Sequence, residues 1–147
     1  MHEFTPLLPG VRVRQLTRRE DERGWLLKLL MREHIEGPLE FGEIYVTTAT
    51  PGQVKGNHFH ERATEWFCVL QGSAQMATRV METGESALTE LSAERPCIIE
   101  VAPGVAHAFR NNGSGPMMLF AYADDPYDYD APDEQRITLL DPAPSPA

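Results

Sequence analysis

The stretch that decides the fold of this 147-residue chain is GQVKGNHFHERATEWFCVLQG, residues 52–72. His58 and His60 are separated by one residue in a run that favours a strand, and Glu65 follows after a short polar interval. Side chains two residues apart on a strand point to the same face. The two imidazoles should therefore share one face, and a turn through 61–64 should bring Glu65 beside them on the paired strand. Three side chains of one hairpin are thus expected to converge on one ion.

A second stretch, PGVAHAFRN at residues 103–111, supplies a fourth polar side chain. Pro103-Gly104 is a turn signal, because proline fixes φ and glycine tolerates a positive φ. His107 then stands near the start of a new strand. Three imidazoles and one carboxylate suit Zn²⁺, Fe²⁺, Mn²⁺, Ni²⁺ or Cu²⁺, and the ligand types alone do not select one of them.

The rest of the chain also has an all-β pattern. Helical periodicity is scarce, and short β-branched and aromatic runs are separated by Gly, Pro and Asn. Strands are expected at 11–16, 25–30, 43–50, 56–60, 66–70, 74–80, 87–91, 97–101, 106–110 and 117–122. One short helix is expected around 31–36. Many short strands at this spacing indicate a sandwich or a barrel.

The length is typical of a single domain. We expect residues 1–140 to form one β-barrel domain and 141–147, which are rich in Pro, Ser and Ala, to form a flexible tail. Residues 123–134 are acidic and interrupted by prolines. They are expected to pack as an ordered flap over the mouth of the barrel.

Composition excludes several classes of partner. The net charge of −9 argues against nucleic acid, whose phosphates are bound by dense basic surfaces. The chain has no apolar stretch near the roughly 20 residues of a membrane span, and its N-terminus lacks the features of a signal peptide. Cys68 and Cys97 lie inside apolar runs, which favours free thiols in a reducing compartment. We therefore expect a cytoplasmic protein without a membrane or nucleic-acid partner.

These residues make the chain resemble the cupin superfamily. Every signature position of the first cupin motif is filled, by Gly52, His58, His60, Glu65 and Gly72. The second motif is matched by Gly104, His107 and Asn111. The resemblance implies an all-β jelly-roll barrel, the double-stranded β-helix, with the metal ligands inside it.

A closer resemblance is to the dTDP-4-dehydrorhamnose 3,5-epimerase group of sugar-nucleotide enzymes. It is carried by segments 21–24, 55–58 and 103–109 and by the Tyr- and Pro-containing ending. Segments 56–60 and 101–111 are most similar to the cupin domain that ends the bifunctional capsular-polysaccharide enzymes of N-acetyl-L-fucosamine synthesis. Those domains bind zinc and are associated with epimerisation at C3 of a 4-keto sugar. The resemblance thus implies Zn²⁺ and an isomerase acting on a nucleotide-linked 4-keto-6-deoxy sugar.

Residues outside the ligand set are expected to bind the substrate and to move protons. Tyr122, Tyr127 and Tyr129 in the closing part of the chain are the acid/base candidates. Arg23, Lys55 and Phe109 are the substrate-binding candidates. Arg23 is expected to bind the nucleotide's diphosphate, Lys55 a phosphate or the sugar, and Phe109 is expected to line the cavity.

One role stays open. In metal-free rhamnose-type epimerases, a histidine that looks equivalent to His58 acts as the base. A metal-bound imidazole cannot also hold that role, so the base is unassigned here.

Two other functions fit the same ligands. A cupin dioxygenase would hold Fe²⁺ with three histidines and a glutamate, and a non-catalytic cupin would bind a small molecule without turnover. The Asp-x-Arg-Gly turn and the Tyr/Pro ending favour the sugar-nucleotide enzyme, since oxygen chemistry needs neither. We also expect a homodimer, as is usual in this superfamily, with an exposed first strand at 11–16 available for pairing.

Overall fold

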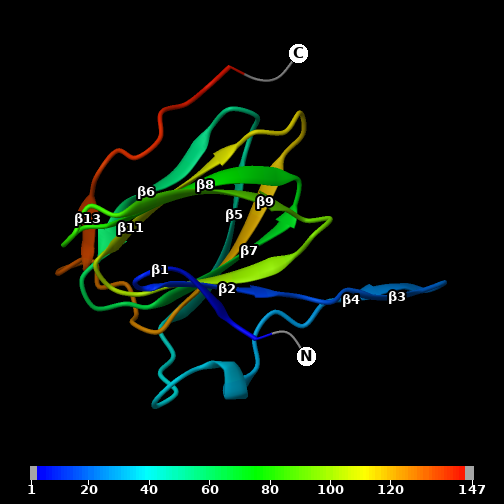
Figure 1. The fold of residues 1–147 in the computed structure, drawn as a ribbon, viewed down its shortest axis with the longest axis horizontal. Helices are drawn as coiled ribbons and strands as arrows, with labels where there is room; N and C mark the ends of the chain where they lie inside the picture. The colour runs from blue at the N-terminus through cyan, green and yellow to red at the C-terminus, as the bar shows by residue number, and fades with distance from the viewer. Residues whose placement is uncertain (1–2, 145–147) are drawn as a thin grey trace.

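Two antiparallel sheets face each other and form a barrel (Figure 1). The structure is a computed structural model that describes residues 3–144. The six-stranded sheet has the order β1 (Thr5–Leu8), β2 (Val11–Gln15), β10 (Cys97–Val101), β7 (Glu65–Gln71), β12 (Met117–Ala123) and β5 (Glu43–Ala49). The five-stranded sheet has the order β13 (Glu134–Arg136), β6 (Val54–His60), β11 (Val105–Asn111), β8 (Ser73–Val80) and β9 (Ser86–Ser92). The predicted all-β jelly-roll architecture is confirmed.

A two-stranded hairpin and one helical turn lie outside the two sheets. The hairpin of β3 (Arg19–Asp21) and β4 (Gly24–Leu26) projects away from the barrel in Figure 1. The turn is η1 (Arg32–His34), a 3₁₀ helix within the region where a short helix was expected. The predicted strand at 25–30 is wrong beyond Leu26, because residues 27–30 leave the hairpin. Sequence patterning also missed β1, β3 and β13, each of which has only three or four residues.

A hydrophobic core fills the space between the sheets. Alternate residues of β7 and β12, such as Phe67, Val69 and Leu119, point into it and are almost fully buried. Met76 and Phe109 meet them from the five-stranded sheet. Because strand side chains alternate between faces, the same strands present their other residues to the outside of the barrel.

A second apolar cluster covers the outer face of the six-stranded sheet. Trp66, Cys68 and Tyr122 form its buried part, and the segment 27–35 packs against them through Leu27, Leu29, Leu30 and Ile35. Burial on both faces explains why β7 reads as an unbroken apolar run. It also explains the error at 25–30, since these leucines are apolar because they cover a sheet and not because they pair within one.

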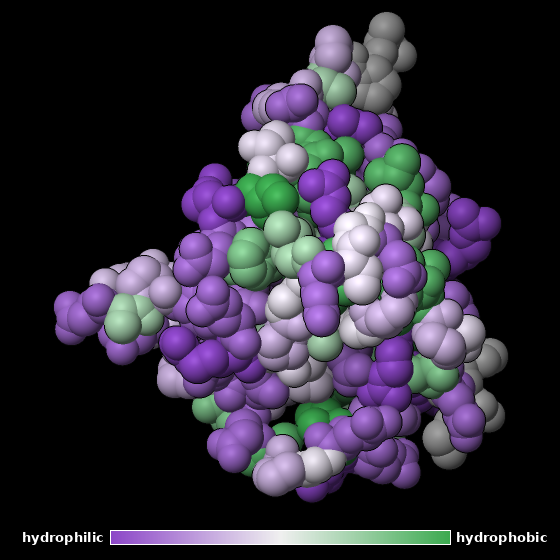
Figure 2. Space-filling model, turned by 60° about the vertical axis from the view of Figure 1, so that its left-hand side comes forward, coloured by the Kyte–Doolittle hydropathy of each residue, from purple (hydrophilic) through white to green (hydrophobic). Residues whose placement is uncertain are grey.

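The free edges of the barrel differ from the expected ones. Strand β2 pairs with β1 on one side and with β10 on the other, so the predicted exposed strand at 11–16 is not an edge. The six-stranded sheet ends instead at β1 and at β5. The outward side chains of β5, Ile44 and Val46, are 55% and 54% exposed. Figure 2 turns the side with β6 and β13 forward and shows a mostly hydrophilic face with hydrophobic groups in small separate areas.

The last described residues follow the surface of the barrel. The carbonyl of Asp141 accepts a hydrogen bond from Arg110, and the N–H of Ala143 donates to the carbonyl of Gly52. Residues 145–147 of the predicted tail lie outside the described residues. Across residues 3–144, no helix has the length and apolar character needed to cross a bilayer.

Candidate metal centre

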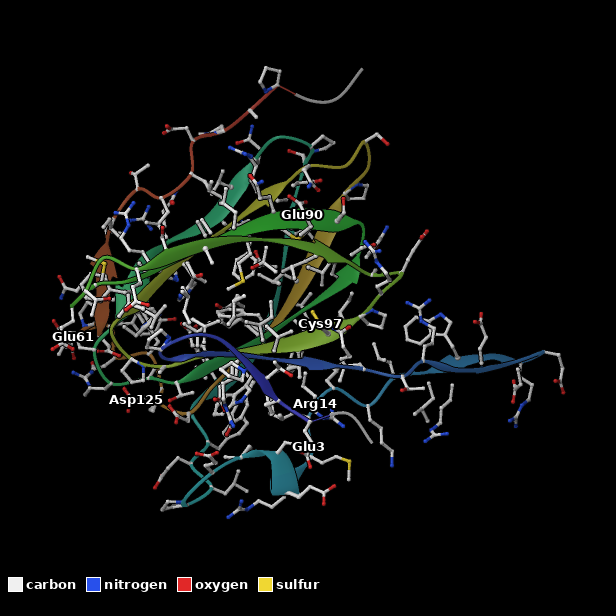
Figure 3. The ribbon with its side chains drawn as sticks, in the orientation of Figure 1. Glu3, Arg14, Glu61, Glu90, Cys97 and Asp125 are labelled. Atoms are coloured by element: carbon white, nitrogen blue, oxygen red, sulfur yellow. The ribbon has the colours of Figure 1, made fainter. Side chains whose placement is uncertain are left out.

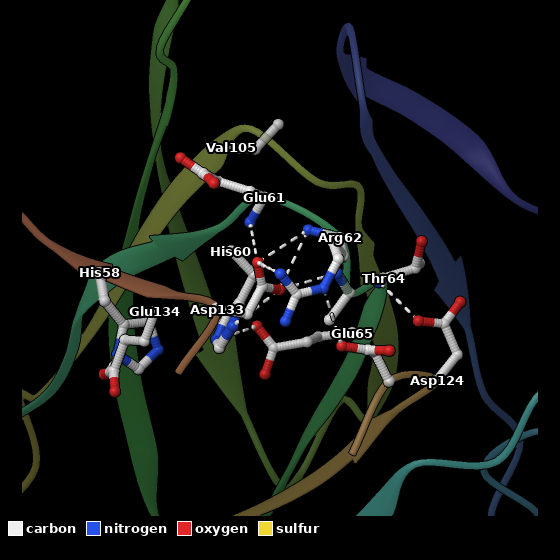
Figure 4. Close-up of polar contacts among 12 residues, drawn as sticks. His58, His60, Glu61, Arg62, Thr64, Glu65, Val105, Asp124, Asp133 and Glu134 are labelled. Carbon is white, nitrogen blue, oxygen red and sulfur yellow. Dashed lines mark hydrogen bonds and ion pairs between the residues drawn. The ribbon is translucent and has the colours of Figure 1, made fainter. Parts of the chain in front are cut away.

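Three imidazoles of one sheet and one carboxylate of the facing sheet meet inside the barrel. His58 and His60 lie on β6 and His107 on β11, while Glu65 opens β7 in the opposite sheet. The expected hairpin is therefore wrong, because β6 pairs with β11 and β13 and the turn at 61–64 crosses from one sheet to the other. An oxygen of Glu65 lies 3.2 Å from Nε2 of His60 and 3.3 Å from Nε2 of His107. The ring centroids of His58 and His107 are 4.8 Å apart. All four predicted ligands are therefore brought together, and Figure 4 shows three of them side by side.

A β-bulge at Gly56-Asn57 turns His58 toward the interior. The register between β11 and β6 shifts there, since His107 pairs with His58 but Ala108 pairs with Gly56. Both bulge residues have a positive φ, +95° at Gly56 and 59° at Asn57. The Asn57 side chain accepts the N–H groups of Leu139 and Leu140 and donates to the carbonyl of Leu140. These bonds secure a backbone conformation that asparagine tolerates better than most residues.

The Pro103-Gly104 turn sets the position of His107. The N–H of Val105 donates to the carbonyl of Ala102, and Gly104 has a φ of +82°. The N–H of Gly104 donates to the carbonyl of His60 at 2.7 Å. The turn that precedes one ligand is thus bonded directly to the strand that carries two others.

Each imidazole turns its Nδ1 toward an acceptor. Nδ1 of His58 is in contact with a carboxylate oxygen of Glu134, and Nδ1 of His60 lies 3.6 Å from an oxygen of Asp133. Nδ1 of His107 is 3.3 Å from the carbonyl oxygen of Val105. A proton on Nδ1 leaves the lone pair of Nε2 available, which is the usual arrangement around metal-bound histidines.

The donor set fits a divalent ion. Zn²⁺ binds nitrogen and oxygen ligands at about 2.0–2.2 Å, so two of its ligand atoms lie at most about 4.4 Å apart. The four ligand atoms here lie within 4.8 Å of one another, and small side-chain adjustments reach that limit. Nε2 of His107 is buried without a hydrogen-bond partner in the described residues. A buried polar atom that lacks a partner is costly unless a ligand satisfies it.

The electrostatics of the centre are unfavourable without a cation. Burial raises the pKa of Glu65 to about 8, and Glu43, Glu134, Asp133 and Asp124 add to the rise. Burial lowers the pKa of His58, and it lowers that of His107 well below its usual value. The centre therefore favours a neutral carboxyl group and neutral imidazoles. A bound cation would instead stabilise the carboxylate form of Glu65.

Two cavities of different character adjoin the centre. An acidic cavity of about 210 Å³ is lined by His58, His60, Glu65 and further carboxylates, among them Glu43 and Asp125. A second cavity of about 340 Å³ is lined by His58 and His107, by Lys55 and by apolar side chains that include Phe109. Lys55 and Phe109 thus lie where the sequence analysis expected them. Figure 3 shows Glu61 and Asp125 at the same end of the barrel, away from Cys97.

The three tyrosines predicted as acid/base groups have different surroundings. Tyr122 lies on the outer face of its sheet, stacks on Trp66 at 4.8 Å and hydrogen-bonds the carbonyl of Glu40. The prediction for Tyr122 is therefore wrong, because alternation along β12 turns it away from the centre. Tyr127 lines the acidic cavity. Tyr129 is 89% exposed and contacts the ring of Tyr127 edge-on.

Arg23 is not near the centre. It lies at the tip of the β3–β4 hairpin, where its guanidinium pairs with Asp21 at 2.7 Å. In Figure 1 this hairpin and the β6–β13 end of the barrel lie on opposite sides of the molecule. Within one chain, Arg23 thus lies away from the metal-ligand cluster, and its binding of the nucleotide's diphosphate stays a prediction.

Tyr45, Asp133 and Glu134 were missed by the sequence analysis although they line the acidic cavity. Tyr45 also lines the second cavity, and burial together with Glu65, Glu43 and Glu134 raises its pKa far above the usual range. Alternation along β5 gave the opposite signal for Tyr45, since it would turn the apolar Ile44 and Val46 inward, whereas these two side chains are 55% and 54% exposed. Asp133 and Glu134 gave no signal, because their positions depend on pairing with β6.

Comparisons with known proteins agree on one family and one fold. The profile of a family described as polysaccharide biosynthesis C-terminal domain matches residues 19–135. The spore coat polysaccharide biosynthesis protein SpsL of Bacillus subtilis is 28% identical over 137 residues, which cover 89% of each chain. The UDP-2-acetamido-2,6-beta-L-arabino-hexul-4-ose reductase of Pseudomonas aeruginosa is 30% identical over 77% of this chain but only 29% of its own length.

A solved structure supports the fold. NovW, a 4-keto-6-deoxy sugar epimerase of the novobiocin gene cluster of Streptomyces spheroides, superposes with a TM-score of 0.83 at 21% identity. The match covers 97% of this chain and 76% of NovW. The predicted resemblance to sugar-nucleotide cupins is confirmed.

Proposed function

The chain belongs to the polysaccharide biosynthesis C-terminal domain family, and from this premise we propose that it is a metal-dependent epimerase or isomerase. Its substrate would be a nucleotide-linked 4-keto-6-deoxy sugar used in the synthesis of a capsule, O-antigen or other glycan. The observation that carries the proposal is the convergence of three imidazoles and one carboxylate beside a cavity that Lys55 borders. The name of SpsL supports the polysaccharide context, and that of NovW supports the 4-keto-6-deoxy sugar.

Epimerisation beside a ketone has three chemical requirements. A base removes the proton next to the carbonyl, a positive group stabilises the enolate oxygen, and an acid returns a proton to the opposite face. A divalent ion held by His58, His60, Glu65 and His107 would act as a Lewis acid toward the carbonyl oxygen. We take Zn²⁺ as the first expectation, with Fe²⁺, Mn²⁺, Ni²⁺ and Cu²⁺ as alternatives for this ligand set.

The other residues of the cavities suit binding and proton transfer. Lys55 provides a positive charge for a phosphate or sugar oxygen, and Phe109 provides an apolar wall. Tyr45 borders both cavities, and its raised pKa keeps the hydroxyl group protonated near neutral pH. It is therefore suited to donate a proton and not to remove one. Tyr127 is the second proton-transfer candidate, from the acidic side.

The test combines elemental analysis of the purified protein with incubation in D₂O. A dTDP- or UDP-linked 4-keto-6-deoxy sugar is added, and NMR follows deuterium at C3. We expect about one equivalent of metal and incorporation of deuterium. Glu65→Gln should lower both, whereas Glu90→Gln on the distant strand β9 should change neither.

Other outcomes would contradict the proposal. Uptake of O₂ by the iron-loaded protein without exchange at C3 would favour a dioxygenase. Tight binding of the sugar nucleotide without exchange would favour a non-catalytic binding protein. Full exchange at C3 by protein that contains no metal would show that the reaction does not need the metal, and it would make His58 the candidate for the base.

We further propose that the protein acts as a homodimer in the cytoplasm. The open edge of β5 and the projecting hairpin, whose Trp25 is 53% exposed, favour association with a second copy. Cys68 and Cys97 are both free thiols, and burial raises their pKa values to about 12 and about 11. Free thiols in the protonated form suit a reducing compartment.

A further inference from the structure

The segment of residues 124–136, here called the closing segment, holds the turn that joins β6 to β7 between two of the proposed metal ligands, His60 and Glu65. At its start, the carboxylate of Asp124 accepts the N–H of Thr64 at 2.8 Å, and the N–H of Asp124 donates to the carbonyl of Thr64. Near its end, Asp133 accepts the N–H groups of Glu61, Arg62 and Ala63 at 2.9–3.1 Å. The turn between His60 and Glu65 is therefore bonded to both ends of the closing segment (Figure 4).

Glu134 contacts a ligand directly. Strand β13 pairs with β6 so that Glu134 lies opposite His60 and Arg136 opposite His58. From this position the Glu134 carboxylate contacts Nδ1 of His58. Asp133, which is 8% exposed, lies 3.6 Å from Nδ1 of His60. Two neighbouring carboxylates of the closing segment thus lie next to the Nδ1 atoms of the two imidazoles of β6.

We propose that Asp133 and Glu134 are positioning residues of the metal centre, and that metal binding and docking of the closing segment stabilise each other. Glu134 fixes the ring of His58 with Nε2 toward the ion. Asp133 fixes the turn that spaces His60 from Glu65. The inference rests on the metal binding proposed above and adds to it a role for a segment that supplies no ligand.

Thermodynamics makes the coupling reciprocal. If docking of the closing segment raises the affinity for the ion by some factor, then the ion favours docking by the same factor. Partners of metal-bound imidazoles typically change metal affinity by about 10–100-fold. The closing segment would therefore be held most firmly when the ion is present, which would cover the acidic cavity that Tyr127 lines.

Asp133 and Glu134 could also favour metal binding through their negative charge alone. A variant of Glu43 distinguishes this explanation from a positioning role. Glu43 lines the same acidic cavity and contributes to the raised pKa of Glu65, but it forms no ion pair with an imidazole in the described residues. Glu43→Gln removes one negative charge from the cavity, as Glu134→Gln does. A role through charge alone would weaken metal binding equally in Glu43→Gln and Glu134→Gln. A positioning role would weaken metal binding more in the Glu134 variants than in Glu43→Gln.

The first measurement is the affinity for Zn²⁺, obtained by competition with a chromophoric chelator. We expect Glu134→Ala and Asp133→Ala to bind Zn²⁺ about 10–100-fold more weakly than the unchanged chain. Glu43→Gln should stay within about threefold. Asp128→Ala is the second control, because Asp128 accepts only the N–H groups of Asp130 and Ala131 within the closing segment. Circular dichroism checks folding, and Asp133→Asn replaces Asp133→Ala if the latter does not fold.

The second measurement is hydrogen–deuterium exchange of the closing segment with and without Zn²⁺. In the unchanged chain, Zn²⁺ should slow exchange in peptides spanning 124–136. In Glu134→Ala, Zn²⁺ should have much less effect on the same peptides. Peptides of β9 serve as the internal reference, since β9 is the opposite edge strand of the five-stranded sheet.

Each result supports or overturns a separate statement. Unchanged Zn²⁺ affinity in both Glu134→Ala and Asp133→Ala would overturn the inference and leave the proposed metal site intact. An equal loss in Glu43→Gln and Glu134→Gln would overturn it in favour of charge. Absence of Zn²⁺ binding by the unchanged chain, with no other divalent ion bound, would overturn the metal site and the inference together.

Discussion

Glu65 is the residue whose charge depends most on a cation. It is 3% exposed, and four other carboxylates raise its pKa in addition to burial. In the metal-free protein it is therefore protonated over a range where the same group in the unfolded chain is ionised. Binding a divalent ion requires that this proton leave.

A pH dependence of stability follows. The folded pKa of Glu65 is about 8 against an ordinary value of 4.5, so its contribution to stability is present at low pH and lost as pH rises to 8. The lowered pKa values of His58 and His107 have the opposite effect, because they make stability rise with pH, but only below about pH 6.5. Between pH 6.5 and 8, the metal-free protein should thus lose up to about 2 kcal/mol of unfolding free energy.

Urea unfolding at pH 6.5 and pH 8 checks this expectation. Glu65→Gln should remove most of the loss, because glutamine does not titrate. With saturating Zn²⁺ the unfolding free energy should instead increase from pH 6.5 to pH 8, because protons compete less with the ion for its ligands as pH rises. A wild-type loss that persists unchanged in Glu65→Gln would show that another group is responsible.

Tyr45 is the residue that we expect to deliver the proton. Tyr45→Phe should lower C3 exchange by about 10²–10⁴-fold, the usual range for one acid/base group. Affinity for Zn²⁺ should not change. Tyr122→Phe is the matched control, because its side chain lies on the outer face of the sheet and stacks on Trp66. Rates are compared by NMR in D₂O, and equal rates for Tyr45→Phe and the unchanged chain would leave Tyr127 as the candidate.

At the scale of an element, the bulge at Gly56-Asn57 determines whether β6 presents its ligands correctly. A Cβ atom at Gly56 would lie 2.8 Å from the carbonyl oxygen of His107, in addition to the cost of the positive φ. The contact is with backbone, so a side-chain rotation cannot relieve it. The two strands would have to separate where they carry His58 and His107.

We therefore expect Gly56→Ala to weaken Zn²⁺ binding at least about tenfold, because metal sites tolerate displacements of only about 0.5 Å. The matched control is Gly84→Ala, which has a similar positive φ but no atom within 4 Å of the new Cβ. The control should cost about 1–2 kcal/mol of stability and leave the affinity unchanged. Thermal unfolding and chelator competition on both variants provide the comparison. Equal Zn²⁺ affinities would disprove the role of the bulge.

At the scale of the whole molecule, the surface is uneven in its exposed apolar side chains. Ile44 and Val46 face outward from the edge strand β5, and Leu39 and Phe41 lie next to them along the chain. The other long edge strand, β9, also exposes Leu88, at 65%, but Glu90 accompanies it. Charges on an edge strand oppose pairing with another chain.

Association through β5 is expected on this basis. The double variant Ile44→Glu with Val46→Glu should sediment as a folded monomer, whereas the unchanged chain and Leu88→Glu should sediment as dimers. Analytical ultracentrifugation measures the masses, and circular dichroism confirms the fold. A dimer that persists in the double variant would place the interface elsewhere, with the β3–β4 hairpin as the next candidate.

The amino-acid sequence by itself determined the all-β class, most of the strands and the four residues of the candidate metal centre. These features depend on local rules: strand alternation sets the face of His58 and His60, and turn residues set where each strand begins. Lys55 and Phe109 were predictable for the same reason, since each lies within a few residues of a ligand or directly on a ligand-bearing strand.

Only the tertiary structure decided what surrounds the ligands. Tyr122 and Tyr45 are both strand tyrosines, and the packing of segment 27–35 on one face of the sheet decides which of them is turned away from the centre. Asp133 and Glu134 reach the ligands because β13 pairs with β6, more than 70 residues earlier in the chain. Arg23 lies on a projecting hairpin for a similar non-local reason. Contacts between segments far apart in sequence leave no periodic pattern, so they follow from the folded chain and not from its local composition.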